Sequence, residues 1–420
     1  MKNKKLILWW FLFPVQLVCA QSPVHLSDCQ QWAREQHPFL KQEELYRKMS
    51  ELNLANNSAD YLPQVILNVQ ATYQSDVTHL GVSLPGVSIP SVSKDQYKAY
   101  LDVKQNIWNG GRTRAGDLLE QAQDQVNRQN VEVELYQVKD QVNNLFFSCF
   151  LLQENLNVLG KKQETLQAQQ SMMESGVRNG LLLQSDLDQI MAELIRVKQQ
   201  KIEIQSDRQS ALSALSILTG KSMEDLGDLV LDSPDISLDG QIQRPELDLF
   251  EKQTELLDAT SNQIGKKRNP NVFGFGQAGY GRPGLNMLND EFGTYYLVGV
   301  GMNWSVFDWK NTKREKEVVR LRQEMVQTQQ QQFERNIRIA LDGKYRKIHQ
   351  LQAILESDRE LITIQERITK SSASKLENGT ITTSDYIQDL NAEMTARITF
   401  ETHHVQLEAA RVDYLDIQGN

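Results

Sequence analysis

Residues 112–178 form a long stretch without proline, and residues 311–377 repeat this feature. In the first stretch, apolar residues recur in alternating steps of three and four: Leu135, Val138, Val142, Leu145, Cys149, Leu152, Leu156 and Leu159. This spacing is close to the 3.5-residue period of coiled-coil packing. At roughly 1.5 Å per residue, a helix over either stretch would be about 100 Å long. A compact globule has no room for such a helix.

The chain also contains two copies of one unit. A turn motif and the Ser-Asp pair after it recur at an offset of 199 residues: Asn179-Gly180 with Ser185-Asp186, then Asn378-Gly379 with Ser384-Asp385. Upstream, Pro38 and Pro63 align with Pro245 and Pro270 at an offset of 207, so the first copy has eight more residues between its strands. Repetition of this kind predicts a duplicated architecture.

Each copy predicts the order helix, strand, loop, strand, very long helix, tight turn and helix. The first repeat covers residues 21–220 and the second covers 245–420, with a linker at 221–244. Asparagine and glycine tolerate positive φ, so the turns near 180 and 379 can end one helix and let an antiparallel helix begin. Each repeat therefore predicts a long helical hairpin.

Four segments are predicted to be strands, at about 63–73, 96–108, 271–281 and 293–307. Apolar and polar residues alternate along each segment, so one face of the strand is apolar and the other is polar. Residues that we expect to face lipid are Tyr97, Leu101, Tyr296, Val300 and Trp304. Ten-residue strands of this kind, with aromatic residues near their ends, are typical of outer-membrane barrels. A strand that faces the core of a β-sandwich has the same pattern. The secretory signal peptide at residues 1–20, the duplication and the long helices favour a barrel instead.

Four strands are too few to close a barrel, because about eight is the smallest useful number and lipid does not tolerate open sheet edges. Several copies must therefore share one barrel. The predicted fold class is an α+β membrane protein, in which long helical hairpins adjoin four strands per chain. The polar loops at 74–95 and 281–293 would be extracellular, and the helices would leave the barrel on the periplasmic side.

Residues 1–20 have the features of a secretory signal peptide: lysines, a short apolar run, and Val18-Cys19-Ala20 at its end. Lipid modification of Cys19 is the alternative processing. The apolar run is shorter than the roughly 20 residues that span a bilayer, and no later stretch is long enough. Any membrane-spanning segments of the mature chain would therefore have to be strands.

Charge and cysteine content exclude two other classes. The formal net charge of −9 becomes −12 without the three lysines of residues 1–20, so the basic footprint of a nucleic-acid-binding protein is absent. After cleavage only Cys29 and Cys149 remain, 120 residues apart. A disulfide scaffold would instead be short and dense in cysteine.

The chain resembles the TolC-like outer-membrane efflux proteins over essentially its whole mature length. The matching segments, besides the two Asn-Gly turns, are Asp60-Tyr61-Leu62-Pro63, Ile107-Trp108-Asn109-Gly110-Gly111-Arg112 and Val306-Phe307-Asp308-Trp309-Lys310. Each motif alone is weak, but their duplicated order is specific. The resemblance implies a homotrimer in outer-membrane lipids, with a twelve-stranded barrel and a twelve-helix periplasmic tunnel. It also implies an equatorial collar formed by 221–244 and the chain ends.

Two kinds of site residue follow from the resemblance. The turns would be tips that contact a periplasmic adaptor protein: Asn179, Gly180 and Leu181 in the first repeat, and Asn378, Gly379 and Thr380 in the second. Thr380 departs from the apolar residue expected there.

Beyond the tips, Asp186 and Asp385 match inward aspartates that narrow the tunnel, and Gln388 stands where a further aspartate is expected. A ring of acids at a constriction favours cations. The competing interpretation is that both aspartates cap the returning helices.

Three motifs of other chemistry are set aside. The glycine pattern at 274–279 has dinucleotide-binding spacing but lies in a predicted strand with no helix after it. His403 and His404 are adjacent, so on a helix they point about 100° apart and do not pair as metal ligands. Met172 and Met173 fit helix packing better than soft-metal handling. We predict no enzyme activity, no cofactor and no metal site.

The predicted function is an outer-membrane exit duct. It would pass small molecules from an adaptor and an inner-membrane RND-type or ABC transporter to the exterior. The alternatives are an exit duct for type I protein secretion and a non-conducting coiled-coil protein that spans the envelope.

Overall fold

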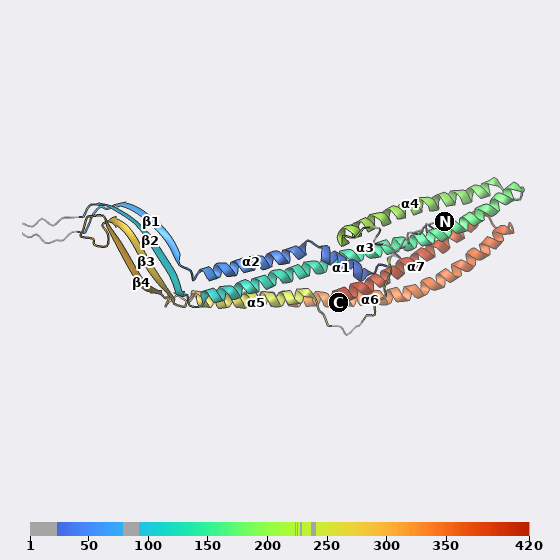
Figure 1. Cartoon of the computed structure of the whole chain (residues 1–420). Coiled ribbons are helices and arrows are strands. Elements are labelled where there is room, and N and C mark those ends of the chain that lie inside the picture. Colours follow the sequence, from blue (N-terminus) through green and yellow to red (C-terminus); the bar gives the residue numbers. More distant parts are fainter. Residues whose placement is uncertain are drawn as a thin grey trace, which may run out of the picture. The chain divides into compact units, whose positions relative to one another are not determined.

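The computed structural model of the chain describes residues 23–78, 92–222, 224, 226, 229–236 and 241–419 (Figure 1). The predicted signal peptide, residues 79–91 of the first loop and part of the linker at 221–244 lie outside the described residues. The elements, in chain order, are α1 (Leu26–Gln36), α2 (Phe39–Ala59), β1 (Gln64–Tyr73), β2 (Asp95–Trp108), α3 (Arg112–Arg178), α4 (Gln184–Thr219), α5 (Pro245–Lys266), β3 (Asn271–Arg282), β4 (Gly293–Asn303), α6 (Asn311–Glu377) and α7 (Thr383–Gln418).

The chain divides into two compact units, and each contains segments of both sequence repeats. We call residues 38–137, 240–342 and 417–420 the sheet unit, because they hold all four strands. Residues 1–37, 138–239 and 343–416 form the tip unit, which holds both helical turns. Helices α3 and α6 each begin in the sheet unit and end in the tip unit. None of the described helices is both long enough and apolar enough to cross a membrane.

The sheet is antiparallel, with strand order β1-β2-β3-β4. Its register places alternate residues of all four strands in common rows. Two rows are Val65, Val103, Gly276 and Val298, followed by Leu67, Leu101, Ala278 and Tyr296. We call the side that carries these rows the apolar face. The rows between them, on the mixed face, include Ile66, Asp102, Gln277 and Leu297, followed by Asn68, Tyr100, Gly279 and Tyr295.

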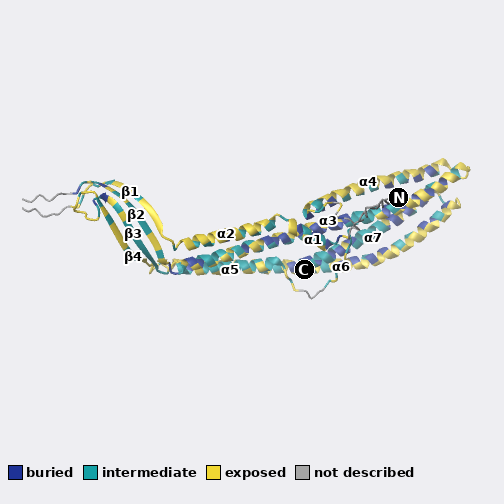
Figure 2. Ribbon diagram, viewed as in Figure 1, coloured by how far each residue is buried: buried dark blue, intermediate teal, exposed yellow. Residues whose placement is uncertain are grey.

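The apolar face is exposed in the single chain. Leu67 is 67% exposed, Val69 76% and Tyr296 78%. Most of β1 has the colour of exposed residues (Figure 2). Residues of this size are normally buried, and a contiguous exposed apolar surface marks an interaction site or a membrane contact. β1 and β4 are the edge strands, so one side of each has no strand partner within the described sheet.

A tight junction joins the two repeats inside the sheet unit, where β2 leads into α3. Gly110 has φ 68° and its carbonyl accepts a hydrogen bond of 2.6 Å from the Asn269 side chain. The Arg112 guanidinium donates to the Lys267 carbonyl at 2.9 Å, at the end of α5. These bonds satisfy backbone carbonyls just before α3 and at the end of α5.

Replacing Gly110 by alanine is expected to destabilise the protein by about 1–3 kcal/mol, because left-handed backbone strains residues other than glycine. An added Cβ would also lie 2.4 Å from the Asn269 Cβ, so that loop would have to move. Gly160→Ala is the matched control in α3, because its added Cβ meets nothing within 4 Å. Thermal unfolding followed by circular dichroism should show a lower midpoint for the first variant only. Equal midpoints would contradict the junction's role.

The structure differs from the sequence predictions at two element ends. β4 ends at Asn303, not at 307, so Trp304 lies beyond the strand that was predicted to contain it. The cause is the start of α6, where Trp309 and Lys310 have positive φ and Asp308 caps the helix by accepting from the Thr312 N–H at 3.0 Å. The first repeat also has two helices before β1 where one was predicted. Pro38 separates α1 from α2, and His37 before it is in extended backbone.

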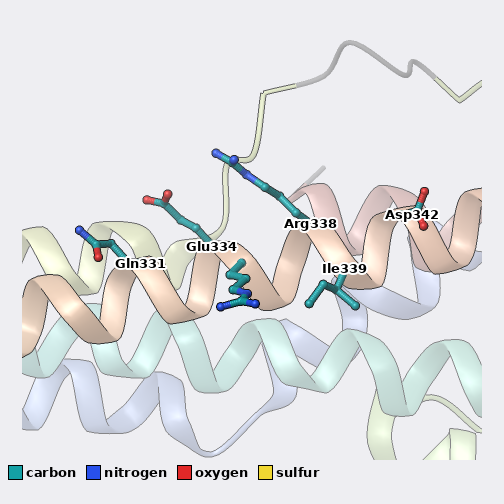
Figure 3. Close-up of a pocket in the computed structure, with 6 residues that line it drawn as sticks. Gln331, Glu334, Arg338, Ile339 and Asp342 are labelled. Atoms are coloured by element: carbon teal, nitrogen blue, oxygen red, sulfur yellow. The ribbon is translucent and has the colours of Figure 1, made fainter.

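A shallow cavity of about 480 Å³ lies along α6 in the sheet unit and is lined by Gln331, Glu334, Arg335, Arg338, Ile339 and Asp342 (Figure 3). A single helix supplies all of these residues, and their charges balance. The hollow is therefore part of a helix surface, and we assign it no role.

Two apolar cores stabilise the tip unit. The first surrounds Val142, Phe146 and Cys149 of α3 and includes Cys29 of α1. The second packs α3, α4 and α7 together through Leu166, Ile190 and Leu390, which are almost fully buried. The apolar residues of α3 that recur at heptad-like spacing thus pack against helices of both hairpins. This packing fixes the positions of the two turns.

Candidate functional site: the helical tips

The first tip is a Schellman turn that ends α3. The Leu181 N–H donates to the Gly176 carbonyl at 2.8 Å, and the Gly180 N–H donates to the Val177 carbonyl at 3.0 Å. Gly180 has φ 71°, the left-handed conformation that this turn requires. Gly176 leaves room for the Leu182 side chain, because a Cβ at this position would lie 2.6 Å from the Leu182 Cδ1. The turn folds Leu182 back over the helix end and leaves Leu181 78% exposed.

The second tip has the same turn at the end of α6. The Thr380 N–H donates to the Lys375 carbonyl at 2.9 Å, and the Gly379 N–H donates to the Leu376 carbonyl at 2.9 Å. Gly379 has φ 68°. The Thr380 hydroxyl also donates to the Lys375 carbonyl, at 3.0 Å. The residue that departs from the expected apolar tip thus bonds to its own helix end.

The two candidate aperture acids have different partners. Asp385 forms a capping box with Thr382: its carboxylate accepts from the Thr382 N–H at 3.0 Å, and its own N–H donates to the Thr382 hydroxyl at 3.2 Å. The hydrogen bonds from Thr382 lower the pKa of Asp385 below its ordinary value. Asp186 accepts instead from the Thr383 hydroxyl at 3.2 Å, and Thr383 belongs to the other hairpin. Gln388 is exposed on α7.

A second link joins the hairpins deeper in the tip unit. Glu193 of α4 is 3% exposed and pairs with Lys162 of α3 at 2.7 Å and with Arg196 at 2.8 Å. The Asn391 side chain of α7 also hydrogen-bonds to it. Burial alone would raise the pKa of Glu193, but the bonds from Lys162 and Arg196 outweigh it and lower the pKa below its ordinary value.

A groove of about 560 Å³ lies between the two tips and has a predominantly apolar lining. Its residues come from both turns and the helices before them: Gln169, Met172, Met173, Ser175, Gly176, Asn179, Leu181, Leu182, Leu376, Glu377, Asn378 and Gly379. Four of the six predicted tip residues, Asn179, Leu181, Asn378 and Gly379, thus line one groove, and Gly180 and Thr380 do not. The groove also explains the two methionines, because Met173 is buried in the core and Met172 is half exposed at the groove wall.

Sequence reasoning missed the links between the hairpins. Thr383 occupies the position that aligns with Gln184, so the duplication does not predict a hydroxyl there. Glu193 and Lys162 are charged residues on long helices, where such residues usually face water. Within the described part of the chain, no cluster of three or more His, Cys, Asp or Glu side chains could hold a metal ion.

The chain is similar to known proteins in sequence and in fold. The family described as outer membrane efflux protein matches residues 30–221. No curated protein sequence matches the chain.

Three solved structures are similar in fold over 94% of this chain. The outer membrane protein VceC from Vibrio cholerae is 13% identical, with a TM-score of 0.67 and 96% of its own chain covered. The CmeC outer membrane channel of Campylobacter jejuni is 14% identical, with a TM-score of 0.65 and 85% covered. The MtrE outer membrane channel of Neisseria gonorrhoeae, in its open state, is 14% identical, with a TM-score of 0.64 and 89% covered.

At such identities the structures establish the fold, and the family match adds the sequence relationship over the first repeat. The resemblance predicted from the sequence is confirmed: residues 30–221 carry the outer membrane efflux protein domain, and the chain has the fold of the outer-membrane channels.

Proposed function

We propose that three copies of this protein form the outer-membrane exit duct of a tripartite efflux pump. The duct conducts small molecules passively from a periplasmic adaptor and an inner-membrane pump to the exterior. No chemistry in the chain is required for this role, because the pump supplies the energy.

The observation that carries the proposal is the exposed apolar face of the sheet. Four strands share one register, so Val65, Leu67 and Val69 lie in rows with apolar or small residues of β2, β3 and β4. Exposure of this apolar surface to water is unfavourable, because each Å² of it costs about 25 cal/mol relative to burial. Lipid contact removes that cost, and the alternation matches the lipid-facing wall of a barrel.

The open edges support sharing of the barrel between copies. β1 and β4 each have unpaired backbone groups along one side of the sheet, and such groups are very unfavourable in hydrocarbon. Pairing of β4 in one copy with β1 in the next satisfies them. Three copies, the number that the resemblance implies, give twelve strands.

The tips support an adaptor as partner. Leu181 is exposed and lines the apolar groove together with Asn179, Asn378 and Gly379 of the two turns. An exposed apolar anchor next to an apolar groove is a typical centre of a protein interface. Thr380 gives the second tip a polar end, so we expect the first tip to contribute more of the adaptor's binding energy.

A non-conducting coiled-coil protein is the main competing function, and the apolar sheet face argues against it. A duct for type I secretion would have the same fold and the same tips. The pump that binds this chain decides between small-molecule efflux and secretion.

The mass of the purified, detergent-solubilised protein tests the shared barrel. We expect three times the mass of the processed chain. A monomer that stays monomeric in lipid nanodiscs would contradict the proposed function.

The two acids beyond the tips are proposed to set ion preference. Removing both together, Asp186→Ala with Asp385→Ala, should weaken the preference for cations, because carboxylates at a constriction attract them. Reversal potentials in a salt gradient measure this preference. Thr382→Val is the matched control, because it loses the hydroxyl half of the cap but retains both charges. Unchanged selectivity in the double variant would assign the acids to helix capping and hairpin contact alone.

A further inference from the structure

The mixed face of the sheet carries four aromatic rings that neighbour glycines on adjacent strands: Tyr100, Phe273, Phe275 and Tyr295. A Cβ added at Gly299 would lie 2.5 Å from the Phe275 Cζ, and one added at Gly301 would lie 2.6 Å from the Phe273 Cζ. The rings therefore lie across glycine backbone of β4. The Phe273 and Phe275 ring centroids are 6.1 Å apart, so they form one continuous surface.

Two tyrosines extend this surface across β3. Gly279 lies between Tyr100 of β2 and Tyr295 of β4 in one row, and a Cβ added there would lie 2.6 Å from the Tyr100 Cβ and 2.9 Å from the Tyr295 Cζ. Both rings are half-buried, so part of each is accessible. Because glycine has no Cβ, aromatic side chains of the neighbouring strands fill the space over its backbone, and the accessible part of each ring stays open to a ligand.

The charge of this face is positive. Lys98 and Lys104 of β2 lie on it, and the Lys104 ammonium is 4.5 Å from the centre of the Phe273 ring. Within the described part of the chain, no carboxylate forms an ion pair with either lysine. Asp102 is the one acidic residue at a mixed-face position of the four strands, and it accepts a hydrogen bond of 3.2 Å from the Gln277 amide.

We propose that the mixed face is a binding surface for planar aromatic anions, such as aromatic carboxylates. The accessible aromatic surface, that of Tyr100 and Tyr295 above all, can stack against a planar ring, and the two lysines attract the negative charge. This inference rests on the proposed function, since the face lines a lumen only where copies close a barrel. Binding must be weak enough for release, as in any conducting path.

The test uses purified full-length mature protein in planar bilayers with 2-naphthoate as the probe. Cyclohexanecarboxylate supplies the negative charge without an aromatic ring, and a naphthylmethylammonium supplies the ring with the opposite charge. We expect naphthoate, added on the side of the sheet loops, to block conductance at concentrations about tenfold lower than either comparator. Block from this side does not require passage beyond Asp186 and Asp385.

The matched variants are neighbours on opposite faces of β4. Tyr295→Leu should weaken block by naphthoate severalfold, whereas Tyr296→Leu, on the apolar face, should leave it unchanged. Lys98→Gln with Lys104→Gln should remove the difference between naphthoate and the aromatic cation.

Two results would overturn the inference: equal block by all three compounds in a conducting wild type, or no binding of naphthoate to a wild type that does not conduct. In a conducting wild type, equal block by all three compounds would show that the rings serve only to cover glycine backbone, and the exit-duct proposal would stand. A wild type without conductance would instead contradict the exit duct. Equilibrium dialysis of naphthoate against the solubilised protein then decides the binding surface separately: binding lost in Tyr295→Leu supports it, and no binding overturns it.

Discussion

Replacing Leu67 by arginine is expected to prevent the protein from assembling in the outer membrane, whereas replacing its neighbour Asn68 by arginine is not. Leu67 lies on the apolar face in a row with Leu101 and Ala278, and it is 67% exposed in the single chain. Arginine on the lipid face of a barrel costs about 2–4 kcal/mol near the bilayer centre. Three copies multiply that cost to about 6–12 kcal/mol per trimer, comparable to the whole stability of a typical domain.

The measurement is the amount of SDS-resistant oligomer in isolated outer membranes. Asn68 is the matched control because it is the next residue of the same strand, with its side chain on the mixed face beside Tyr100. If both arginine variants assembled to the same extent, the apolar face would not be the membrane-facing wall.

Replacing Glu193 by alanine is expected to destabilise the tip unit by about 3–5 kcal/mol, because the change leaves a buried ammonium without its partner. Lys162 is 6% exposed and lies 2.7 Å from the Glu193 carboxylate. Replacing both residues, Lys162→Met with Glu193→Leu, should restore most of the lost stability, because apolar side chains of similar size fill the same space. Denaturant unfolding followed by circular dichroism measures both changes.

An exposed ion pair gives the control for this experiment. Glu317 pairs with Arg320 one turn away on α6, and both side chains are more than half exposed, so Glu317→Ala should leave the unfolding midpoint almost unchanged. A loss in Glu193→Ala no larger than in the control would contradict the structural role of the buried pair.

The pH dependence of stability follows from the same carboxylate. The pKa of Glu193 is lowered in the folded protein from its ordinary value of 4.5. Its contribution is therefore fully present above about pH 4.5 and declines as the pH falls through the lower folded-state value. The Lys162→Met, Glu193→Leu protein should lack this part of the acid sensitivity.

The long helices and the strands could be predicted because their patterns extend over many residues. A proline-free stretch of coiled-coil spacing over 112–178 and period-two alternation in the strands each admit one element type. The Asn-Gly turns were also predictable, since a Schellman turn requires a left-handed residue and glycine, here Gly180 and Gly379, adopts that conformation without steric cost.

Interactions between distant segments were not predictable. Nothing in the sequence near Asp186 indicates that its partner is Thr383, 197 residues later, and the helix period alone places Glu193 equally well in water. The alternation also continued through Trp304, although the start of α6 ends the strand earlier. The mixed face was predicted as polar, and the aromatic rings on it became visible only when the register placed them beside glycines of neighbouring strands.

The ion conductance of the purified protein in a planar lipid bilayer tests the central claim that copies of this chain close one conducting barrel. We predict discrete, stable channels of uniform conductance, and their loss in the Leu67→Arg protein. Protein that inserts in lipid as a trimer but gives no conductance at any voltage or pH would contradict the exit-duct function.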